Sequence, residues 1–449
     1  MGLKPARASA GNPTEAGVAA RSAASRLLRG VLGGTPLDSL IEPTTGDAAF
    51  RQLPPRDRAL TRAVVATTLR RRGQILAMLH RLMERGVPPR SGRLQSILEI
   101  AAAQILFLDV PAYAAVSTAM ADAEGDRHAR HFKPLINGVL RRLAREREDF
   151  PSAADTSLVN TPEWLRERWV ATYGKDLALK IAAAHLVEPG LDLTVKHDPK
   201  GWAEKLGGIV LPNGTARLVP SGPIEALPGY GEGAWWVQNA AAALPVRLLG
   251  EVAGKRVADL CAAPGGKTAG LALAGADVTA VDISAGRLQR LAGNLARLQL
   301  AADLVAADVL AWTPAERFDA VLLDAPCSAT GTIRRHPDIP WIKRPDDIAG
   351  LADLQFRLIE RAAGLLKPGG ILVYCTCSLE PEEGEAHLTR LATRNHELTL
   401  VPVEPGELTG LAETRTPEGA VRTLPSHLPN PEPRLAGLDG FFIVRWQKT

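Results

Sequence analysis

The chain has 449 residues, and 46% of them are hydrophobic, which is enough for more than one packed domain. Only 4 cysteines are present, so no disulfide framework is expected, and a reducing cytoplasm is the expected location. No apolar run approaches the roughly 18 residues that a membrane span needs, and the amino terminus lacks the apolar core of a secretory signal.

The net charge of +4 is unevenly distributed along the chain. Residues 1–150 hold 23 Lys and Arg against 14 Asp and Glu, a balance of +9, whereas the remaining residues carry −5. A basic, Arg-rich amino-terminal third suggests a polyanionic partner, and nucleic acid is the first candidate. A solvated helical surface whose charge matters only for solubility would look the same, so charge alone leaves both interpretations open.

Residues 1–15 are small, polar and turn-rich, and we expect them to form a mobile tail. Residues 16–148 are predicted to form an all-helical domain, because their apolar side chains recur at helical spacing and no strand pattern appears. The predicted helices are Ala19–Leu32, Arg56–Arg72, Gln74–Arg85, Gly92–Leu108, Ala112–Ala123 and Phe132–Glu148.

Residues 149–240 are predicted to connect two domains. They begin with a polar stretch and later become rich in Gly and Pro, which is typical of a small mixed α/β segment. The predicted elements are helices over 162–173 and 175–186, a strand over 192–197, and an entry at 235–239 into a helix over 240–249.

Residues 241–449 are predicted to form an α/β domain, because strands and helices alternate. The predicted strands are Arg256–Leu260, Asp277–Asp282, Leu304–Asp308, Phe318–Asp324 and Gly370–Cys377, and the predicted helices are Lys267–Leu273, Ala285–Leu298 and Asp346–Leu366. This alternation implies a mostly parallel sheet with helices on both faces. We expect Leu398–Val403 and Phe441–Trp446 to add edge strands, and Arg415–Pro433 to be a long loop.

Asp259–Thr268 is a glycine-rich turn between a predicted strand and a predicted helix. Glycines let the backbone come close to a ligand, and a helix amino terminus favours a negative group. The P-loop spacing is absent. Asp282 ends the next strand, where a carboxylate can accept both hydroxyls of a ribose, and Asp308 ends the third, where it could hold an adenine amino group. Each aspartate alone reads as a helix cap, but together with the turn they indicate an adenosine-type cofactor.

Two further segments carry thiols at predicted strand ends. Asp324–Ser328 contains Cys327 and leads into a basic loop, in which Arg334 and Arg335 are candidate RNA phosphate contacts. His336 is expected to be a local hydrogen-bonding residue. The stretch 371–385 is an apolar strand that follows a turn at 368–370, ends in two cysteines and turns into an acidic helix start.

Three motifs, Asp259–Thr268, Asp324–Ser328 and 376–378 (Thr-Cys-Ser), together resemble the RNA cytosine-5 methyltransferases of the RsmB/NOP2/Sun family. Residues 16–148 resemble the NusB-like RNA-binding fold, most distinctively at 137–142, which points to the RsmB (Sun or Fmu) branch. The resemblance runs from about residue 20 to the closing Asp439–Phe442. It implies a Rossmann-like, S-adenosylmethionine-dependent methyltransferase domain behind an all-α NusB-like domain.

The resemblance also implies a substrate and a reaction. The substrate would be a cytosine in unassembled small-subunit (16S) ribosomal RNA, with no membrane partner; a monomer is expected. Cytosine C5 is a poor nucleophile, and a thiolate that adds at C6 activates it toward the sulfonium methyl group. Such a reaction needs one deprotonated cysteine, a proton donor near N3 and a target base that has left its stack.

The resemblance assigns roles to individual residues. It implies that Cys377 is the nucleophile, that Cys327 assists product release and that Asp324 contacts the cytosine or the cofactor. The cofactor-binding positions that it implies are Cys261, Ala262, Ala263, Pro264, Gly265, Gly266, Lys267, Asp282, Asp308 and Asp324.

Two positions depart from the family pattern. Cys375 stands before Thr376, where the family often has Ala or Ser, and it is predicted to be a small core residue inside the strand. Asn239 stands where the family often has Asp, so the sequence leaves the role of that acid open.

Three other functions remain open from the sequence. The four cysteines could converge on a metal or redox site; Cys375 and Cys377 share a strand face, but no His stands at ligand spacing, so no metal is predicted. A non-catalytic RNA-binding or antitermination factor would need only the helical domain. The same methyl transfer could act on transfer RNA instead of ribosomal RNA.

Overall fold

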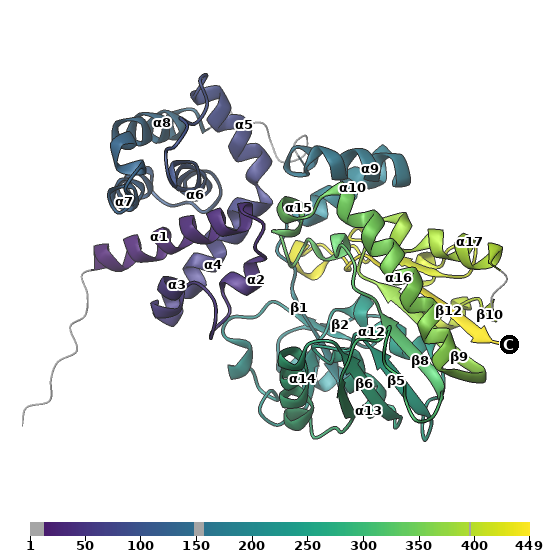
Figure 1. Ribbon diagram of the computed structural model, residues 1–449. Helices are drawn as coiled ribbons and strands as arrows, with labels where there is room; N and C mark the ends of the chain where they lie inside the picture. The colour runs from purple at the N-terminus through teal and green to yellow at the C-terminus, as the bar shows by residue number, and fades with distance from the viewer. Residues whose placement is uncertain (1–12, 148–156, 395–396) are drawn as a thin grey trace, which may run out of the picture. The chain divides into compact units, whose positions relative to one another are not determined.

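The structure is a computed structural model that describes residues 13–147, 157–394 and 397–449 (Figure 1). Most of the predicted tail, residues 1–12, and much of the predicted polar connector, residues 148–156, lie outside the described residues. The chain divides into two compact units. One comprises Met1–Arg166 and His336–Lys343, and the other comprises Glu167–Arg335 and Arg344–Thr449.

The described residues of the first unit form helices joined by turns and contain no strand, as the apolar periodicity predicts. Its α-helices, purple to blue in Figure 1 except for α15, are α1 (Pro13–Leu32), α2 (Leu37–Leu40), α3 (Ala48–Gln52), α4 (Pro55–Arg70), α5 (Arg72–Leu82), α6 (Leu94–Phe107), α7 (Ala112–Glu124), α8 (Lys133–Arg145) and α15 (Ile339–Ile342). Buried leucines, valines and alanines on the inner faces form two clusters, one centred on α1 and α4 and the other on α5 to α8. The predicted all-helical domain is confirmed.

The helical unit includes a short segment from much later in the chain, His336–Lys343. The indole Nε1 of Trp341 donates a hydrogen bond to the carbonyl oxygen of Leu69 (3.1 Å). The Nδ1 atom of His336 lies 3.3 Å from a carboxylate oxygen of Asp38. His336 therefore contacts a residue far from it in sequence, rather than the local partner that was expected.

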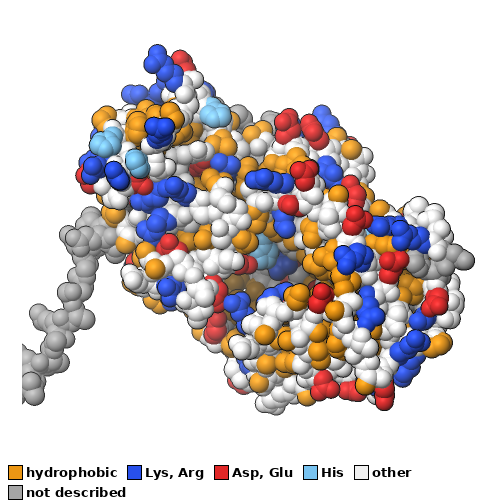
Figure 2. Space-filling model, in the orientation of Figure 1, with side chains coloured by type: hydrophobic (Ala, Val, Ile, Leu, Met, Phe, Trp, Pro, Cys, Tyr) orange, Lys and Arg blue, Asp and Glu red, His pale blue; other side chains and the backbone are white. Residues whose placement is uncertain are grey.

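Part of the positive charge of this unit is used in its own packing. Arg72 pairs with the fully buried Glu99 (2.9 Å), and Arg93 pairs with Asp122 and Asp126 (3.0 and 3.1 Å). Other Lys and Arg side chains are spread over the visible face of the unit (Figure 2). A polyanionic partner for this surface stays a prediction.

The second unit begins with two helices and a small sheet. The helices are α9 (Glu163–Tyr173, from Glu167 onward in this unit) and α10 (Lys175–His185). The sheet has the order β2-β3-β1-β4, with all neighbours antiparallel, and its strands are β1 (Leu191–Val195), β2 (Ile209–Val210), β3 (Ala216–Leu218) and β4 (Trp235–Val237). Helix α11 (Pro199–Lys205) lies between β1 and β2 in sequence and packs on this sheet.

The large sheet has the order β10-β12-β9-β8-β5-β6-β7, and β11 also pairs with β12. Its strands are β5 (Arg256–Leu260), β6 (Asp277–Asp282), β7 (Asp303–Ala306), β8 (Phe318–Asp324), β9 (Leu366–Thr376), β10 (Leu398–Leu400), β11 (Val421–Thr423) and β12 (Phe441–Lys448). Strands β5 to β9 are parallel, and β12 is antiparallel to β9. The carboxyl ends of the five parallel strands therefore share one edge.

Helices cover both faces of the large sheet (Figure 1). One face packs on α12 (Ala240–Leu248), α13 (Gly266–Leu273) and α14 (Ala285–Leu298), and the other on α16 (Pro345–Leu365) and α17 (Glu385–Thr393). The central strand β8 is consequently an unbroken apolar run from Val321 to Leu323, as strands buried on both faces are. The predicted α/β fold is confirmed. None of the helices in the described ranges combines the length and apolarity that a bilayer crossing requires.

Four local predictions are wrong. Pro368–Gly370 is not a turn, because β9 starts at Leu366 and runs through it, with a shift in its register against β8. Strand β12 is not an edge strand, since β10 and β9 flank it. The predicted loop Arg415–Pro433 contains β11, and β7 ends before Asp308. Strand order depends on pairings between distant segments, which a local pattern does not carry.

Candidate active site

The turn from β5 to α13 brings backbone close to the carboxyl edge of the large sheet. Gly265 has a φ of +99°, and a Cβ added there would lie 2.6 Å from the Cγ of Leu291, so only glycine fits. Beneath the turn, the buried carboxylate of Asp259 accepts a hydrogen bond from Thr268 Oγ1 (2.6 Å). Burial raises the pKa of Asp259 to about 7. The buried carboxylate of Asp259 thus holds the turn in place at the carboxyl edge of the large sheet.

The two aspartates predicted to hold an adenosine differ in their surroundings. Asp282 is buried and accepts hydrogen bonds from the backbone N–H groups of Ala263 (3.2 Å) and Ser284 (3.0 Å). Asp308 is exposed and accepts from the backbone of Leu310 (3.0 Å), two residues beyond the end of β7. Both carboxylates therefore bond to nearby loop backbone, but neither is a helix cap, since Ser284 caps α14 and no helix follows Asp308 directly.

Lys267 and Asp324 form an ion pair at the amino end of α13 and the carboxyl end of β8. The ammonium Nζ of Lys267 lies 2.6 Å from Oδ2 of Asp324, and the Cys375 thiol donates to Oδ1 (3.5 Å). Burial alone would lower the pKa of Lys267, but the neighbouring negative charges, Asp324 first, raise it above its ordinary value. The lysine stays charged, and the carboxylate that it holds remains one-third exposed.

The two cysteines of the Asp324–Ser328 and Thr-Cys-Ser motifs meet. Their sulfur atoms, in Cys327 and Cys377, are 3.4 Å apart, and both are free thiols. The hydrogen-bonded contact with Cys377, burial and the negative charge of Glu383 hold the pKa of the Cys327 thiol well above its ordinary value. Cys327 therefore keeps its proton.

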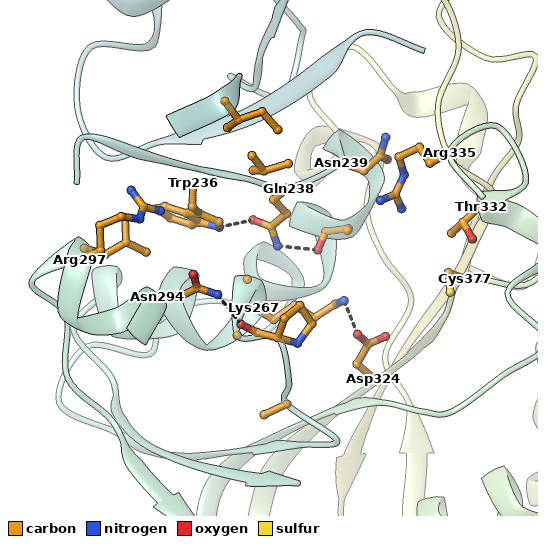
Figure 3. Close-up of a pocket in the computed structure, with 18 of the residues that line it drawn as sticks. Trp236, Gln238, Asn239, Lys267, Asn294, Arg297, Asp324, Thr332, Arg335 and Cys377 are labelled. Carbon is orange, nitrogen blue, oxygen red and sulfur yellow. Dashed lines mark hydrogen bonds and ion pairs between the residues drawn. The ribbon is translucent and has the colours of Figure 1, made fainter. Parts of the chain in front are cut away.

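A cavity of about 440 Å³ brings these groups together (Figure 3). It runs from Cys377 and Asp324 past Lys267 toward Asn294 and Arg297. Of the predicted site residues, the cavity is lined by Ala262, Pro264, Gly265, Gly266, Lys267, Asp324, Arg335 and Cys377. The predicted residues outside its lining are Cys261, Ala263, Asp282, Asp308, Cys327 and Arg334.

Several cavity residues carry no signal in the sequence that would assign them to a site. Trp236 and Gln238 come from the small sheet, Asn294 and Arg297 from α14, and Phe441 from β12. The indole Nε1 of Trp236 donates to Gln238 Oε1 (3.0 Å), and Arg297 Nη1 donates to a backbone carbonyl, that of Tyr230 (2.8 Å). Only the fold brings these segments to one place, because they are spread over about 200 residues of chain.

The two arginines predicted to contact RNA phosphates have different environments. Arg334 is 2% exposed and donates to the backbone carbonyl oxygens of Ala436 (2.6 Å) and Leu438 (3.3 Å). It is not placed to reach a phosphate, so that expectation is corrected: this basic loop residue is buried because two carbonyl oxygens of the segment before β12 accept its hydrogen bonds. Arg335 lines the cavity, and its Nε donates to the buried carboxylate of Asp439 (2.7 Å).

Asn239 has a partner that an aspartate could not replace without cost. Its Nδ2 donates to Oδ2 of the buried Asp192 (3.2 Å), and its Oδ1 accepts from the backbone of Ala241 (3.0 Å) as the cap of α12. Asp192 is already paired with the buried Arg217 (2.6 Å). An aspartate at 239 would face a second carboxylate, so the amide suits this network.

The described residues contain no group of three or more His, Cys, Asp or Glu side chains arranged to hold a metal ion.

Comparisons with known proteins agree with both units. A model of the 16S rRNA methyltransferase RsmB/F family matches residues 246–447, and a model of the NusB family matches residues 18–145. The chain is 35% identical over 380 residues to the ribosomal RNA small subunit methyltransferase B of Vibrio cholerae, covering 80% of this chain and 87% of that protein. It is 32% identical over 439 residues to the protein of the same name from Cronobacter sakazakii, covering 92% and 97%.

The chain belongs to the RsmB/F methyltransferase family. Solved structures share the fold: PH0851 superimposes with a TM-score of 0.73 at 23% identity, over 96% of this chain and 99% of that one. A methyltransferase homologue from Pyrococcus horikoshii has a TM-score of 0.53 at 28% identity, over 67% and 100%. The family resemblance and the NusB-like and Rossmann-like domains read from the sequence are confirmed.

Members of the RsmB/F family use S-adenosylmethionine, so the expected cofactor is also confirmed. The residues present fit it. Ile283, next to Asp282 at the carboxyl edge, is 72% exposed and offers an apolar face for a flat ring. The glycine turn next to it leaves space where a larger residue would intrude.

Proposed function

We propose that the chain methylates C5 of a cytosine in small-subunit (16S) ribosomal RNA, through a covalent bond between Cys377 Sγ and cytosine C6. The observation that carries the proposal is the pair of sulfur atoms 3.4 Å apart, beside a cavity that also holds the Lys267–Asp324 pair. Two thiols at one site suit a reaction that makes and later breaks a covalent bond. The names of the relatives from Vibrio and Cronobacter support small-subunit ribosomal RNA as the substrate.

The reaction begins when Cys377, as a thiolate, forms a bond to C6. The electron pair of the C5–C6 double bond moves into the ring toward N3, and C5 becomes nucleophilic. S-adenosylmethionine, when bound, supplies an electrophilic methyl group on a sulfonium. After transfer, water acting as the base takes the hydrogen on C5 as a proton, the C5–H bonding pair re-forms the C5–C6 double bond, and the C6–S bond breaks to return the thiolate.

The other residues bind, orient and handle protons. Asp324 faces the cavity as a polar contact for the cytosine, and Lys267 fixes its carboxylate in place through their 2.6 Å ion pair. Cys327 keeps its thiol proton next to the nucleophile and can donate a hydrogen bond from it to the sulfur of Cys377 as that sulfur leaves C6 as a thiolate. That role accounts for product release.

The target base must leave its stack to reach Cys377. A cavity of about 440 Å³ has room for one extruded pyrimidine beside the reacting groups. The proposal takes unassembled 16S ribosomal RNA as the substrate, a monomeric enzyme and a cytoplasmic location. The NusB-like unit, with its balance of +9 in residues 1–150, would add backbone contacts that hold the RNA.

The test is bisulfite mapping of cellular RNA from strains with the wild-type gene, with the Cys377→Ala variant and with a deletion. We expect one 16S cytosine to be protected only with the wild-type protein. The purified protein should then methylate naked 16S RNA faster than assembled small subunits. A protected cytosine in transfer RNA alone, or none at all, would contradict the proposed substrate.

A further inference from the structure

We propose that Glu383 is a positioning residue that fastens the loops of Cys327 and Cys377 to each other and so sets the contact between the two thiols. This inference rests on the proposed function for its consequences in catalysis. Its geometry stands apart from it. Glu383 lies in a short turn of helix, Pro381–Glu383, between β9 and α17, and its side chain is fully buried.

Both loops donate hydrogen bonds to this one carboxylate. From the first loop, the backbone N–H of Ser328 donates to Oε1 (2.9 Å) and its hydroxyl donates to Oε2. From the second loop, the hydroxyl of Ser378 donates to Oε2 (2.5 Å). Ser328 directly follows Cys327 and Ser378 directly follows Cys377. The carboxylate therefore ties together the residues next to the two thiols.

Glu383 is itself held by the surrounding structure. Gln355 of α16 donates from Nε2 to Oε1 of Glu383 (2.9 Å) and to the carbonyl oxygen of Pro326 (2.9 Å). The carbonyl oxygen of Glu383 accepts from the hydroxyls of Tyr374 (2.8 Å) and Thr376 (3.0 Å) in β9. Helix α16 and strand β9 therefore support Glu383 on both sides. We call the Glu383 carboxylate, with its bonds to the two thiol loops, the clamp.

The clamp also carries charge. An ionised carboxylate only accepts hydrogen bonds, and four donors point at Glu383, while within the described part of the chain it forms no ion pair. Its charge helps to raise the pKa of the Cys327 thiol, after the contact with Cys377 and burial. The titratable groups that face Cys327 are Cys377, Glu383 and the buried Tyr374, whose own pKa burial raises. Glu383 would therefore keep the proton on Cys327.

Two substitutions separate the clamp from its charge. Glu383→Ala removes all four acceptor bonds. Glu383→Gln keeps the shape and, because serine hydroxyls can rotate to accept, most of the bonds, but it removes the charge. Glu382→Ala is the matched control: Glu382 is the neighbouring residue, its side chain is 46% exposed, and it pairs with Arg168 instead of with the thiol loops.

The first measurement is thiol proximity in the full-length protein, without RNA. Diamide takes two electrons and two protons from a pair of adjacent thiols and leaves a disulfide. Peptide mass spectrometry then gives the rate of the Cys327–Cys377 bond. We expect this rate to fall about tenfold or more in Glu383→Ala, to stay near wild type in Glu382→Ala, and not to fall in Glu383→Gln. An unchanged rate in a folded Glu383→Ala protein would overturn the clamp.

The second measurement is the pH profile of iodoacetamide alkylation at Cys327. Glu383→Gln should move this profile to lower pH, because the neighbouring charge is gone, and a merely structural role would not move it. An unmoved profile would overturn the claim that the charge of Glu383 keeps the proton on Cys327. This test uses only Glu383→Gln, so it remains decisive even if Glu383→Ala does not fold. Single-turnover methyl transfer to 16S RNA should slow about tenfold to a hundredfold in Glu383→Ala. If wild type shows no transfer, the proposed function fails while the two RNA-free assays still decide the clamp.

Discussion

The loops after β8 and β9 are built alike and yet present different thiols. Each follows a parallel strand, carries a cysteine and then a serine, and each serine donates to Glu383. However, Cys377 lines the cavity and Cys327 does not, and Cys327 is the thiol whose pKa is raised well above its ordinary value. The comparison teaches that residue type alone does not assign a role. Under the proposed mechanism, access to the cavity makes Cys377 the nucleophile, and a raised pKa keeps Cys327 protonated as a hydrogen-bond donor.

Backbone hydrogen bonds also join the segments that follow β8 and β9. The N–H of Ala325 donates to the carbonyl oxygen of Cys375 (3.1 Å), and the N–H of Gly331 donates to that of Cys377 (3.0 Å). A change in the position of one loop should therefore move the other. Substitutions of Cys377 and Cys327, which stand at equivalent places in the two loops, test whether their roles differ.

Replacing the nucleophile should have the largest effect. Cys377→Ala leaves no sulfur in the cavity to attack C6, so methyl transfer should fall by about 10⁴-fold or more. Transfer of radiolabelled methyl from S-adenosylmethionine to 16S RNA measures this. Binding of the cofactor by calorimetry is the control and should persist. Turnover near the wild-type rate would break the proposed distinction between the loops.

Replacing the second thiol should block release without blocking transfer. In Cys327→Ala the nucleophile remains, but no neighbouring thiol donates a hydrogen bond to its sulfur as it leaves C6. We expect one methyl group per enzyme and then an RNA–protein adduct that survives denaturing electrophoresis. Cys377→Ala should form no adduct, and the double variant should form none either. An adduct in Cys377→Ala would show that Cys327, and not Cys377, attacks C6.

The parts of this comparison that depend on short-range patterns could be predicted from the sequence. The bounds of β5, β6, β8 and α14 agree with the prediction, because a strand buried on both faces is a continuous apolar run, and Ser284 caps α14 by accepting from the backbone of Arg287 (3.3 Å). The strand ends then place Cys327 and Cys377 at one edge of the sheet. That both thiols act at one site is what the family resemblance implies, and the structure places their sulfur atoms 3.4 Å apart.

Burial of charged residues could not be predicted. Glu383 reads as part of an exposed acidic helix start, and Arg334 reads as a surface phosphate contact, yet both are buried. Their partners lie in other segments: Ser328 for the first and Ala436 for the second. Whether a charged side chain is buried depends on such distant donors and acceptors, and a single sequence contains no signal for them.

Removing Lys267, which pairs with Asp324 at the start of the Cys327 loop, should lower kcat by an intermediate amount. Lys267→Met keeps the length of the side chain but takes away the ammonium that lies 2.6 Å from Asp324. Because the carboxylate loses the group that orients it, kcat should fall about 100-fold. Lys367→Met is a control, since Lys367 pairs with Asp319 at the opposite end of β8 (2.7 Å) and lies outside the cavity lining. An equal loss in both variants would indicate a general effect on stability.

Replacing Cys375, which lies inside β9, should have the smallest effect on kcat. Cys375 lies two residues before the nucleophile, is fully buried and reaches Asp324 only through a thiol donor at 3.5 Å. Since a thiol is a weak donor, Cys375→Ala should lower kcat by only about two- to fivefold, with adduct formation intact. The same change at Cys377 should remove the reaction, so this pair of variants compares a sulfur inside β9 with one just past its end that lines the cavity. A loss of adduct in Cys375→Ala would move the nucleophile into the strand interior, where no extruded base could reach it without opening the packing between β8 and β9.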